Sequence, residues 1–253
     1  MIVVQNGPTC GIYAWLNGLK ALFGLEKLTS GEMESLVLKL LIRNERTFKN
    51  KEEKGKTFVG EFFTLEDYIV FLKDNSAFVI KEIYEITGEK INFNITTMPI
   101  NESEKCLEKE ENQKTMFICS ILPRNPLFPL RKADKNKTIL HWISFLSKSN
   151  GHKYRVMDSR YRRRLRMSWK KINSQHKRLK GEKYYWDKFG RKSKKEDDIN
   201  IYLKFKTEQM KCFVSNGILK KVIYQTGRIV CLREIPECFD ECSDREESSE
   251  VRT

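Results

Sequence analysis

The sequence is poor in histidine and lacks a long apolar run. Only three of its 253 residues are histidines, and the HExxH pattern of zinc peptidases is absent. No run of about 18 apolar residues occurs, so we expect no membrane-spanning helix. A glycine-rich phosphate-binding loop is also missing, which argues against nucleotide chemistry. We therefore expect no metal, no cofactor and no membrane partner, so that any chemistry depends on the protein's own side chains.

Signals for secretion are missing as well. The start, MIVVQNGPTC, has neither the basic residues nor the long apolar stretch of a signal peptide, which favours a cytoplasmic location. The seven cysteines are odd in number and irregularly spaced, so free thiols are expected rather than a disulfide framework. Cys238 and Cys242 would bind zinc only with two more ligands, for which Cys212 and Cys231 are weak candidates, so free thiols are the better interpretation there too.

Positive charge is concentrated in one segment. Apolar residues make up 40% of the chain, enough for a sizeable core, and the formal net charge is +14. Residues 155–195 hold 17 Lys/Arg and three acids, so their local charge of +14 equals that of the whole chain. From Glu234 onward the chain is acidic, with eight Asp/Glu and two Arg. We predict one domain, an insertion and a tail. The domain comprises 1–159 and 199–235, the basic insertion 160–198, and the acidic flexible tail 236–253.

Helical patterns come first along the chain. Apolar residues recur at helical spacing from residue 10, and Gly24 suits the end of that helix. Thr29 and Glu32 form a capping-box pattern for a second helix, and Thr64 with Asp67 opens a third. The predicted segments are a short strand at 2–5, helices at 10–23, 30–41 and from 65 through 71, and a loop at 44–60.

Strand patterns follow the helices. The predicted strands are 77–83, 91–95, 116–122, 139–146 and 153–157. Residues 219–235, with Thr226-Gly227 in the middle, are typical of a closing hairpin, whereas 199–213 are ambiguous between helix and strand. Helices followed by an antiparallel sheet indicate an α+β fold.

A thiol at the head of the first predicted helix is the leading candidate for chemistry. Cys10 begins the apolar pattern, where unpaired backbone N–H groups and the helix dipole favour a thiolate. Gly11 would leave room for a substrate to approach. Gln5 lies just upstream, and its side-chain N–H together with the Cys10 backbone N–H would form an oxyanion hole. A thiolate beside two such donors suits acyl-transfer chemistry.

A nucleophilic thiol needs a base, and His141 is the best of the three histidines. It lies in TILHWISFL, on a predicted core strand, with Trp142 beside it as a shield from water. Asp158 ends the next predicted strand, so a hairpin would return it to His141 and orient the ring. His152 follows a turn, and His176 lies in the basic segment. The candidate catalytic set is Cys10, His141, Asp158 and Gln5.

Each of these residues also has a purely structural interpretation. A lone cysteine or a strand histidine is most often a packed core side chain, and an aspartate before Ser159 fits a turn. Gln5 alone carries little information. Their conjunction, in this order and on these types of element, favours a catalytic site.

The order of these residues resembles that of the papain-like cysteine peptidases, particularly the bacteriocin-processing C39-like branch. The chain is more similar to the actin maturation protease family. The resemblance lies in QNGPTCGIYAWLNGL, GKTFVGEFFTLEDYIVFL and NPLFPLRKADKNKTILHWISFL, followed by YRVMDS. The middle stretch carries Gly60-Glu61, Phe63 and a following helix, as that family does. Together these stretches span residues 2–158 in order.

This resemblance implies a papain-like fold, in which N-terminal helices carrying the cysteine pack on an antiparallel sheet carrying the histidine. It implies a cytosolic aminopeptidase that removes an acetylated N-terminal Met or Cys from new actin. By position it assigns the nucleophile to Cys10, the base to His141 and the oxyanion position to Gln5. Asp158 matches with a different spacing after His141, and the basic segment has no counterpart in the family.

The resemblance also gives the basic segment a role. An immature actin N-terminus is rich in Asp and Glu, and a positive surface near the cleft would attract it. Our hypothesis is that RYRRRLR, residues 160–166, receives this acidic segment, with Arg162, Arg163 and Arg164 as substrate-binding residues. The structural alternative is a solvated insertion. Nucleic-acid binding is a further alternative, because aromatic residues interleave with the cations, although no nucleic-acid motif supports it. These aromatic residues are Tyr161, Trp169, Tyr184, Tyr185 and Trp186.

Two other functions fit the same residues. A papain-like scaffold without activity would bind RNA or another acidic partner, and a deubiquitinase would use the same thiol and imidazole. Reactivity of the thiol toward iodoacetamide at neutral pH separates the enzymes from the binding protein. Cleavage of an acetylated actin peptide separates the two enzymes.

Overall fold

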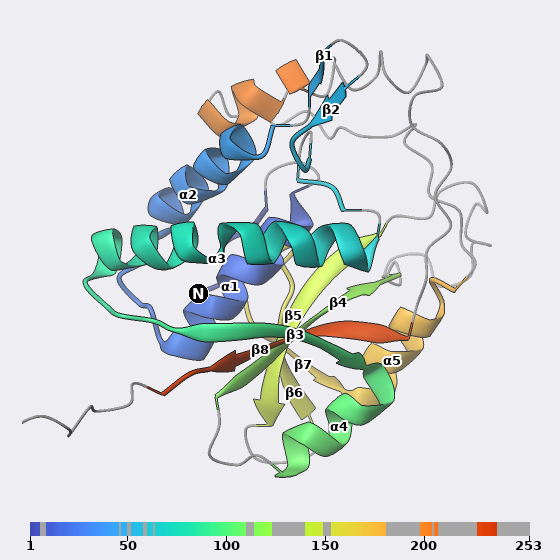
Figure 1. The fold of residues 1–253 in the computed structure, drawn as a ribbon. Coiled ribbons are helices and arrows are strands. Elements are labelled where there is room, and N and C mark those ends of the chain that lie inside the picture. Colours follow the sequence, from blue (N-terminus) through green and yellow to red (C-terminus); the bar gives the residue numbers. More distant parts are fainter. Residues whose placement is uncertain are drawn as a thin grey trace, which may run out of the picture.

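The computed structural model has an α+β fold with a six-stranded antiparallel sheet (Figure 1). It confirms the α+β class expected from the order of the elements. The residues that the structure describes are 1–5, 9–45, 47–49, 52–57, 60–62, 64–109, 114–122, 140–148, 153–180, 198–203, 205–206 and 227–236.

Capping residues mark the end of the first helix and the start of the second, as predicted, whereas the second helix continues two residues beyond its predicted end at residue 41. Helix α1 (Cys10–Phe23) ends at Gly24, whose φ of 71° is the left-handed conformation that glycine tolerates. Helix α2 (Ser30–Arg43) begins with the predicted capping box, since Thr29 Oγ1 accepts from the Glu32 N–H and the Glu32 carboxylate accepts from the Thr29 N–H.

Helix α3 (Leu65–Thr87) is much longer than predicted. Its N-terminus is capped by Thr64, whose side chain accepts from the Asp67 N–H, as the sequence indicated. The predicted strand at 77–83 is wrong, because these residues continue α3 without interruption. Phe71, Asn75, Val79 and Ile83 are buried at intervals of four, so the helical period extends through a stretch whose β-branched residues suggested a strand.

Smaller elements were also missed. Helix α4 (Ile100–Lys109) was not predicted. The segment 44–60 contains a two-stranded hairpin, β1 (Thr47–Lys49) and β2 (Glu52–Lys54), rather than loop alone. Residues 2–5 do not form a strand, although single backbone hydrogen bonds join them to the loop after residue 158.

The main sheet has the strand order β3-β8-β4-β5-β6-β7, and every neighbouring pair is antiparallel. Its strands are β3 (Phe93–Pro99), β4 (Thr115–Ile121), β5 (His141–Lys148), β6 (Lys153–Met157), β7 (Leu165–Ser168) and β8 (Arg228–Glu234). The predicted hairpin at 219–235 is wrong for β8, which pairs with β3 on one edge and β4 on the other. Its predicted first arm, before Gly227, lies outside the described residues.

Two cores cover the two faces of this sheet. Met116 and Ile118 of β4 belong to the larger core, which contains α1, α2 and α3, while Phe117 and Cys119 belong to the second core. Helix α5 (Trp169–Lys177) packs in that second core. Figure 1 shows α1, α2 and α3 on one side of the sheet and α4 and α5 on the other. The alternation along β4 is the two-residue period of a strand buried on both faces.

Part of the predicted basic insertion contributes to this fold. β7 is an edge strand of the main sheet, and α5 follows it directly. Residues 198–203 are helical, and the Tyr202 hydroxyl donates to the Leu41 carbonyl of α2. Residues 181–197, and the predicted acidic tail from 237 onward, lie outside the described residues. Within the described ranges, no helix is both long and apolar enough to cross a membrane.

Candidate active site

The Cys10 thiol lies at the N-terminus of α1. Cys10 is the first residue of that helix, and its exposed fraction is 8%. The helix packs against β5 and β4, so the start of the chain is held against the central strands. No acidic side chain lies in the first turn of α1, so the positive end of the helix dipole is not neutralised there. The position suits a sulfur anion.

His141 and Asp158 are in direct contact. His141 opens β5, and the pairing of Ser144 with Met157 brings the end of β6 back toward it. The distance between His141 Nε2 and Asp158 Oδ1 is 2.7 Å, and both side chains are buried. Cys10 is close enough to His141 to contribute, by hydrogen bonding and charge, to a raised pKa of the imidazole. Because Nε2 faces the carboxylate, Nδ1 is the ring nitrogen that serves the thiol.

Arg160 binds the same carboxylate from the other side. Its Nε donates to Asp158 Oδ1 at 3.0 Å and to Oδ2 at 3.2 Å, and its backbone N–H donates to Oδ1 at 3.0 Å. Burial alone would raise the pKa of Asp158, but the hydrogen bonds and charges of Arg160 and His141 outweigh it and hold that pKa far below its ordinary value. The carboxylate is therefore ionised at any pH near neutrality.

The ionised carboxylate changes the protonation of His141. Burial would lower the pKa of the imidazole, but the hydrogen bonds to Asp158 and Cys10 and the charges of these groups raise it above its ordinary value. An imidazolium beside a sulfur at a helix N-terminus is the charge arrangement that activates a cysteine nucleophile.

Gln5 is held beside this group by backbone and side-chain bonds. The Ser159 hydroxyl donates to Gln5 Oε1 at 2.6 Å, and the Gln5 backbone N–H donates to the Ser159 carbonyl at 3.0 Å. Asn17 of α1 exchanges two bonds with Val3, at 2.8 and 2.9 Å. The segment 2–5 is thus fixed between α1 and the residue that follows Asp158.

A short loop packs against the start of α1. Gly60 has a φ of 87°, and a Cβ there would lie 2.9 Å from the Thr9 Cα. A Cβ on Gly11 would meet the Phe62 ring at 2.6 Å. Gly11 therefore makes room for this loop, and not for a substrate as its sequence position suggested. The Tyr68 hydroxyl donates to the Gly11 carbonyl at 2.7 Å, which anchors α3 at the same place.

Trp142, the residue after His141 on β5, is a buried side chain. Its exposed fraction is 1%, and its ring centroid is 4.3 Å from that of Tyr68. These rings, with Phe62 next to Tyr68, form a buried aromatic cluster that contacts the start of α1 at Gly11.

The three predicted substrate-binding arginines are exposed in the loop between β6 and β7. Arg162, Arg163 and Arg164 follow directly on the loop residues that hold Gln5 and Asp158. The Ile2 N–H donates to the Arg162 carbonyl at 3.2 Å, so the backbone of this loop lies beside the N-terminal segment. Three positive side chains are thus placed next to the chain that leads to Cys10.

The structure brings together Cys10, His141 and Asp158, and it places Gln5 beside them through Ser159. Sequence reasoning missed Ser159 and Asn17 as supports of Gln5. It assigned Arg160 only to the basic segment. The tripeptide Asp158-Ser159-Arg160 contained a signal, because an arginine two residues beyond an aspartate in a turn reaches back to its carboxylate.

The other described histidine has a structural role. His176 Nε2 accepts from the Gly227 N–H at 3.0 Å, so its Nδ1 carries the proton and donates to the Ser120 carbonyl at 2.8 Å. Within the described part of the chain, no group of three His, Cys, Asp or Glu residues is arranged to hold a metal ion. Cys212, Cys238 and Cys242, which we expect to be free thiols rather than zinc ligands, lie outside that part, and Cys231 is a reduced thiol buried in the second core.

The chain matches no protein-family model, no curated protein and no solved structure at a significant level.

Proposed function

We propose that this protein is a papain-like cysteine peptidase that acts as an aminopeptidase on the N-terminus of immature actin. One observation carries the proposal, namely that the Cys10 thiol, His141 and the ionised Asp158 lie together, with His141 Nε2 2.7 Å from Asp158 Oδ1 and with Cys10 contributing to the raised pKa of the imidazole. A cysteine that is only a packed core residue does not require a buried histidine and a buried carboxylate in line behind it. The order of the three residues is that of a nucleophile, its base and the group that orients the base.

In the first half of the proposed reaction, the thiol proton moves to Nδ1 of His141 and the sulfur attacks the carbonyl carbon of the N-terminal residue. The developing oxyanion receives hydrogen bonds from the Cys10 backbone N–H and from the side-chain amide of Gln5. Ser159 supports this role because its hydroxyl occupies the Gln5 amide oxygen, which leaves the NH2 group as the end that donates. The C–N bond then breaks, and the imidazolium gives its proton to the leaving amine.

In the second half, water hydrolyses the thioester. His141 takes a proton from the water as its oxygen attacks the acyl carbon, and the C–S bond breaks to regenerate the sulfur anion. The products are the acetylated amino acid and a protein with a new N-terminus. Asp158 stays ionised throughout and stabilises the imidazolium that forms twice in the cycle.

The three arginines of the β6–β7 loop favour a substrate whose N-terminal segment is acidic. Arg162, Arg163 and Arg164 are exposed, and their backbone lies against the segment that precedes the nucleophile. A peptide whose scissile bond sits at Cys10 would extend its next residues along this region. Asp and Glu in those residues would gain Coulomb attraction and a faster encounter. The resemblance to actin maturation proteases, and the acidity of the actin N-terminus, make actin the preferred substrate and the cytoplasm the expected location.

Mass spectrometry of synthetic peptides tests the proposal. The substrates carry acetyl-Met or acetyl-Cys before a run of Asp and Glu, and each is incubated with the wild-type protein or with Cys10→Ala. We expect loss of the single acetylated residue with the wild type and none with Cys10→Ala. Cys119→Ala serves as control, since Cys119 is a buried thiol on β4 whose pKa is raised by burial. Equal cleavage by the wild type and Cys10→Ala would refute the proposal.

A further inference from the structure

The outer face of α5 is a strongly charged surface that the proposed chemistry does not use. Residues 169–180 contain five Lys/Arg and no Asp or Glu. α5 buries one stripe against the sheet, formed by Trp169, Ile172, Gln175 and His176. The remaining positions of the helix face outward, and most of them are positively charged.

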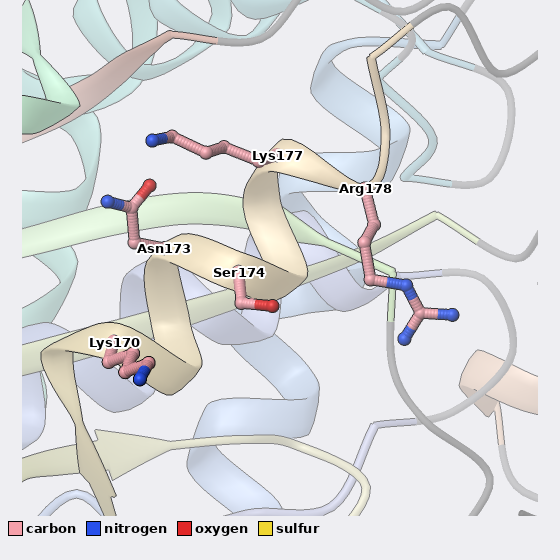
Figure 2. A pocket seen from close by; sticks show the side chains of 5 residues that line it. All are labelled: Lys170, Asn173, Ser174, Lys177 and Arg178. Carbon is pink, nitrogen blue, oxygen red and sulfur yellow. The ribbon is translucent and has the colours of Figure 1, made fainter.

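A hollow of about 430 Å³ lies along this outer face. The described residues that line it are Lys170, Asn173, Ser174, Lys177 and Arg178, and Figure 2 shows their side chains on α5, with Arg178 directly after the last turn of the helix. Among the described residues, no carboxylate pairs with the three cations. The carboxamide oxygen of Asn173 is buried and has no hydrogen-bond partner in that part of the chain. The hollow therefore offers unneutralised positive charge together with an amide oxygen that can accept a hydrogen bond from a peptide N–H.

The C-terminal end of α5 lies near the end of the sheet that carries His141. The Leu122 N–H donates to the Gln175 carbonyl at 3.1 Å. Leu122 follows Ile121, which is the strand partner of His141. Lys177 and Arg178 come directly after these contacts, whereas Lys170 lies at the start of the helix. The row of cations thus begins near the active-site end and leads away from it.

We propose that the outer face of α5 is a docking surface for an acidic peptide segment of the substrate, beyond the residues that enter the active site. The inference rests on the proposed function and adds to it a second anchor. Lys170 and Lys177 are seven residues apart on one face, a separation of about 10 Å along a helix. A peptide in the polyproline II conformation advances about 9 Å in three residues and has three residues per turn, so carboxylates three positions apart lie on one side and would meet both lysines.

A peptide fits this surface better than a single-stranded nucleic acid does. Proteins that bind single strands stack the bases on exposed aromatic rings between the cations. The Trp169 ring is buried in the second core. The Tyr161 side chain is exposed, but it lies in the β6–β7 loop and not on α5, and the Arg160 guanidinium is 5.3 Å from its ring centroid. The three other aromatic residues that suggested RNA binding, at 184–186, lie outside the described residues. α5 itself presents lysine, arginine, serine and asparagine, which suit carboxylates.

A binding titration tests this surface without requiring turnover. The full chain carrying Cys10→Ser is titrated against a fluorescein-labelled peptide with Glu at every third position, at low and at physiological salt. A second Cys10→Ser protein carries Lys170→Glu, Lys177→Glu and Arg178→Glu. We expect this α5 variant to bind the peptide about tenfold more weakly, with the difference shrinking as salt screens the charges.

The matched control changes the same net charge elsewhere. Lys73, Lys90 and Lys105 are exposed cations of α3, the segment after it and α4, and their replacement by Glu should change peptide affinity about threefold or less. Equal weakening in the two triple variants would overturn the docking surface, because only net charge would then matter. Unchanged peptide affinity in the α5 variant would overturn it too. So would a loss confined to a labelled oligouridine probe, which would assign the surface to nucleic acid.

A cleavage assay separates this inference from the proposed function. Cys10-containing proteins are given a short acetylated peptide that ends near the scissile bond and a long one that continues with an acidic segment. The α5 substitutions should raise KM for the long peptide and leave both kinetic constants for the short peptide unchanged. If the wild type cleaves neither peptide, the proposed function fails while the titration still decides the docking surface. If the α5 variant loses activity on both peptides equally, the docking surface fails while the proposed function stands.

Discussion

Asp158 is the residue on which two positively charged partners converge. It accepts from His141 on one side and from Arg160 on the other, with little exposure to water. The arginine keeps the carboxylate ionised, and the carboxylate in turn favours the imidazolium form of His141. Asp158 and Arg160 therefore control the pH dependence of a reaction that Cys10 and His141 perform.

Asp158→Asn tests this control. The carboxamide preserves the shape but removes the charge, so the pKa of His141 should fall because its principal charged hydrogen-bond partner is lost. For an enzyme that requires the imidazolium, the alkaline limb of kcat/KM then moves to lower pH, and kcat/KM falls by about a hundredfold near neutrality. A pH profile on the acetylated peptide measures both. Asp198→Asn, at an exposed aspartate, is the control. An unmoved alkaline limb would show that Asp158 does not tune the histidine.

His176 makes folding sensitive to mild acid. Burial lowers the pKa of His176, the bond to the Ser120 carbonyl opposes this shift, and Lys177 adds to it. Because the folded pKa lies below the unfolded one, the native state takes up fewer protons, and stability present above about pH 6.5 is lost as the pH falls toward the folded pKa. His141, whose folded pKa is raised, acts in the opposite sense and only above that pH. The effect of His141 on stability therefore does not overlap with the loss of stability that His176 causes below about pH 6.5.

Thermal unfolding between about pH 7 and pH 5 measures the effect of His176. The wild type should lose about 1.4 kcal/mol of stability for each pH unit within the window, and His176→Gln should lose less over the same range. His176→Gln keeps a side chain that can donate to Ser120 or accept from Gly227, but it does not titrate. Parallel pH curves for the two proteins would contradict the assignment.

At the scale of elements, a loop and a helix terminus hold the nucleophile in place. The segment 60–62 packs on Thr9 and Gly11 from above, and Tyr68 of α3 bonds to the Gly11 carbonyl. The start of α1 is therefore fixed by parts of the chain about 50 to 60 residues away, as well as by its own helical hydrogen bonds. A small displacement of this loop should reach the sulfur directly.

Gly60→Ala tests that contact, with Gly88→Ala as a matched control. Both glycines have positive φ, at 87° and 73°, but an added Cβ meets Thr9 only at Gly60 and meets nothing within 4 Å at Gly88. Gly88→Ala should cost about 1 kcal/mol of backbone strain and leave activity unchanged. Gly60→Ala should cost about 2–3 kcal/mol and lower kcat as well, because Thr9 must shift. Urea unfolding and peptide kinetics measure the two effects. Equal behaviour of both variants would exclude a role for the contact.

The elements that the sequence predicted well are those with local signals. The capping box at Thr29 and the glycine at residue 24 act within one helical turn, and both lie where predicted. The period of two predicted β4 and β6, with β6 within the same bounds. Helix α3 was truncated because its β-branched residues favour strands locally, while packing against the sheet decides their conformation.

In the candidate site, too, the sequence predicted what local signals determine and missed what long-range contacts determine. Cys10, His141 and Asp158 were found because each stands at the end of a predictable element, where the chain direction fixes its position. The bonds of Asn17 to Val3 and of Ser159 to Gln5 join residues 14 and 154 positions apart. No local pattern encodes such pairings, since they depend on how α1 and the β6–β7 loop meet in the folded molecule.

For the whole molecule, the asymmetric charge is the dominant property. Ten cations and no acids in residues 160–180 give one region a positive field that attracts acidic ligands from a distance. Within this region, the β6–β7 loop lies beside the N-terminal segment, and its residues Arg162, Arg163 and Arg164 are exposed and do not contribute to the core. Substitution there should alter encounter with substrate more than folding.

Replacement of Arg162, Arg163 and Arg164 by Glu tests this field. We expect kcat/KM for an acidic acetylated peptide to fall by about tenfold or more at low salt, and the difference from wild type to narrow at high salt. A neutral acetylated peptide should be cleaved equally by both proteins. Turnover of the acidic peptide that is unchanged at low and at high salt would refute a role for these arginines.

The position of β8 between β3 and β4 has a consequence for synthesis on the ribosome. β3 and β4 each pair with β8 and not with each other, so β3 is joined to the rest of the main sheet only through residues 228–234. The thiol, imidazole and carboxylate at 10, 141 and 158 all emerge from the ribosome earlier. A nascent or prematurely terminated chain therefore contains Cys10, His141 and Asp158 before the main sheet is complete. The sheet is completed only when β8 inserts between β3 and β4.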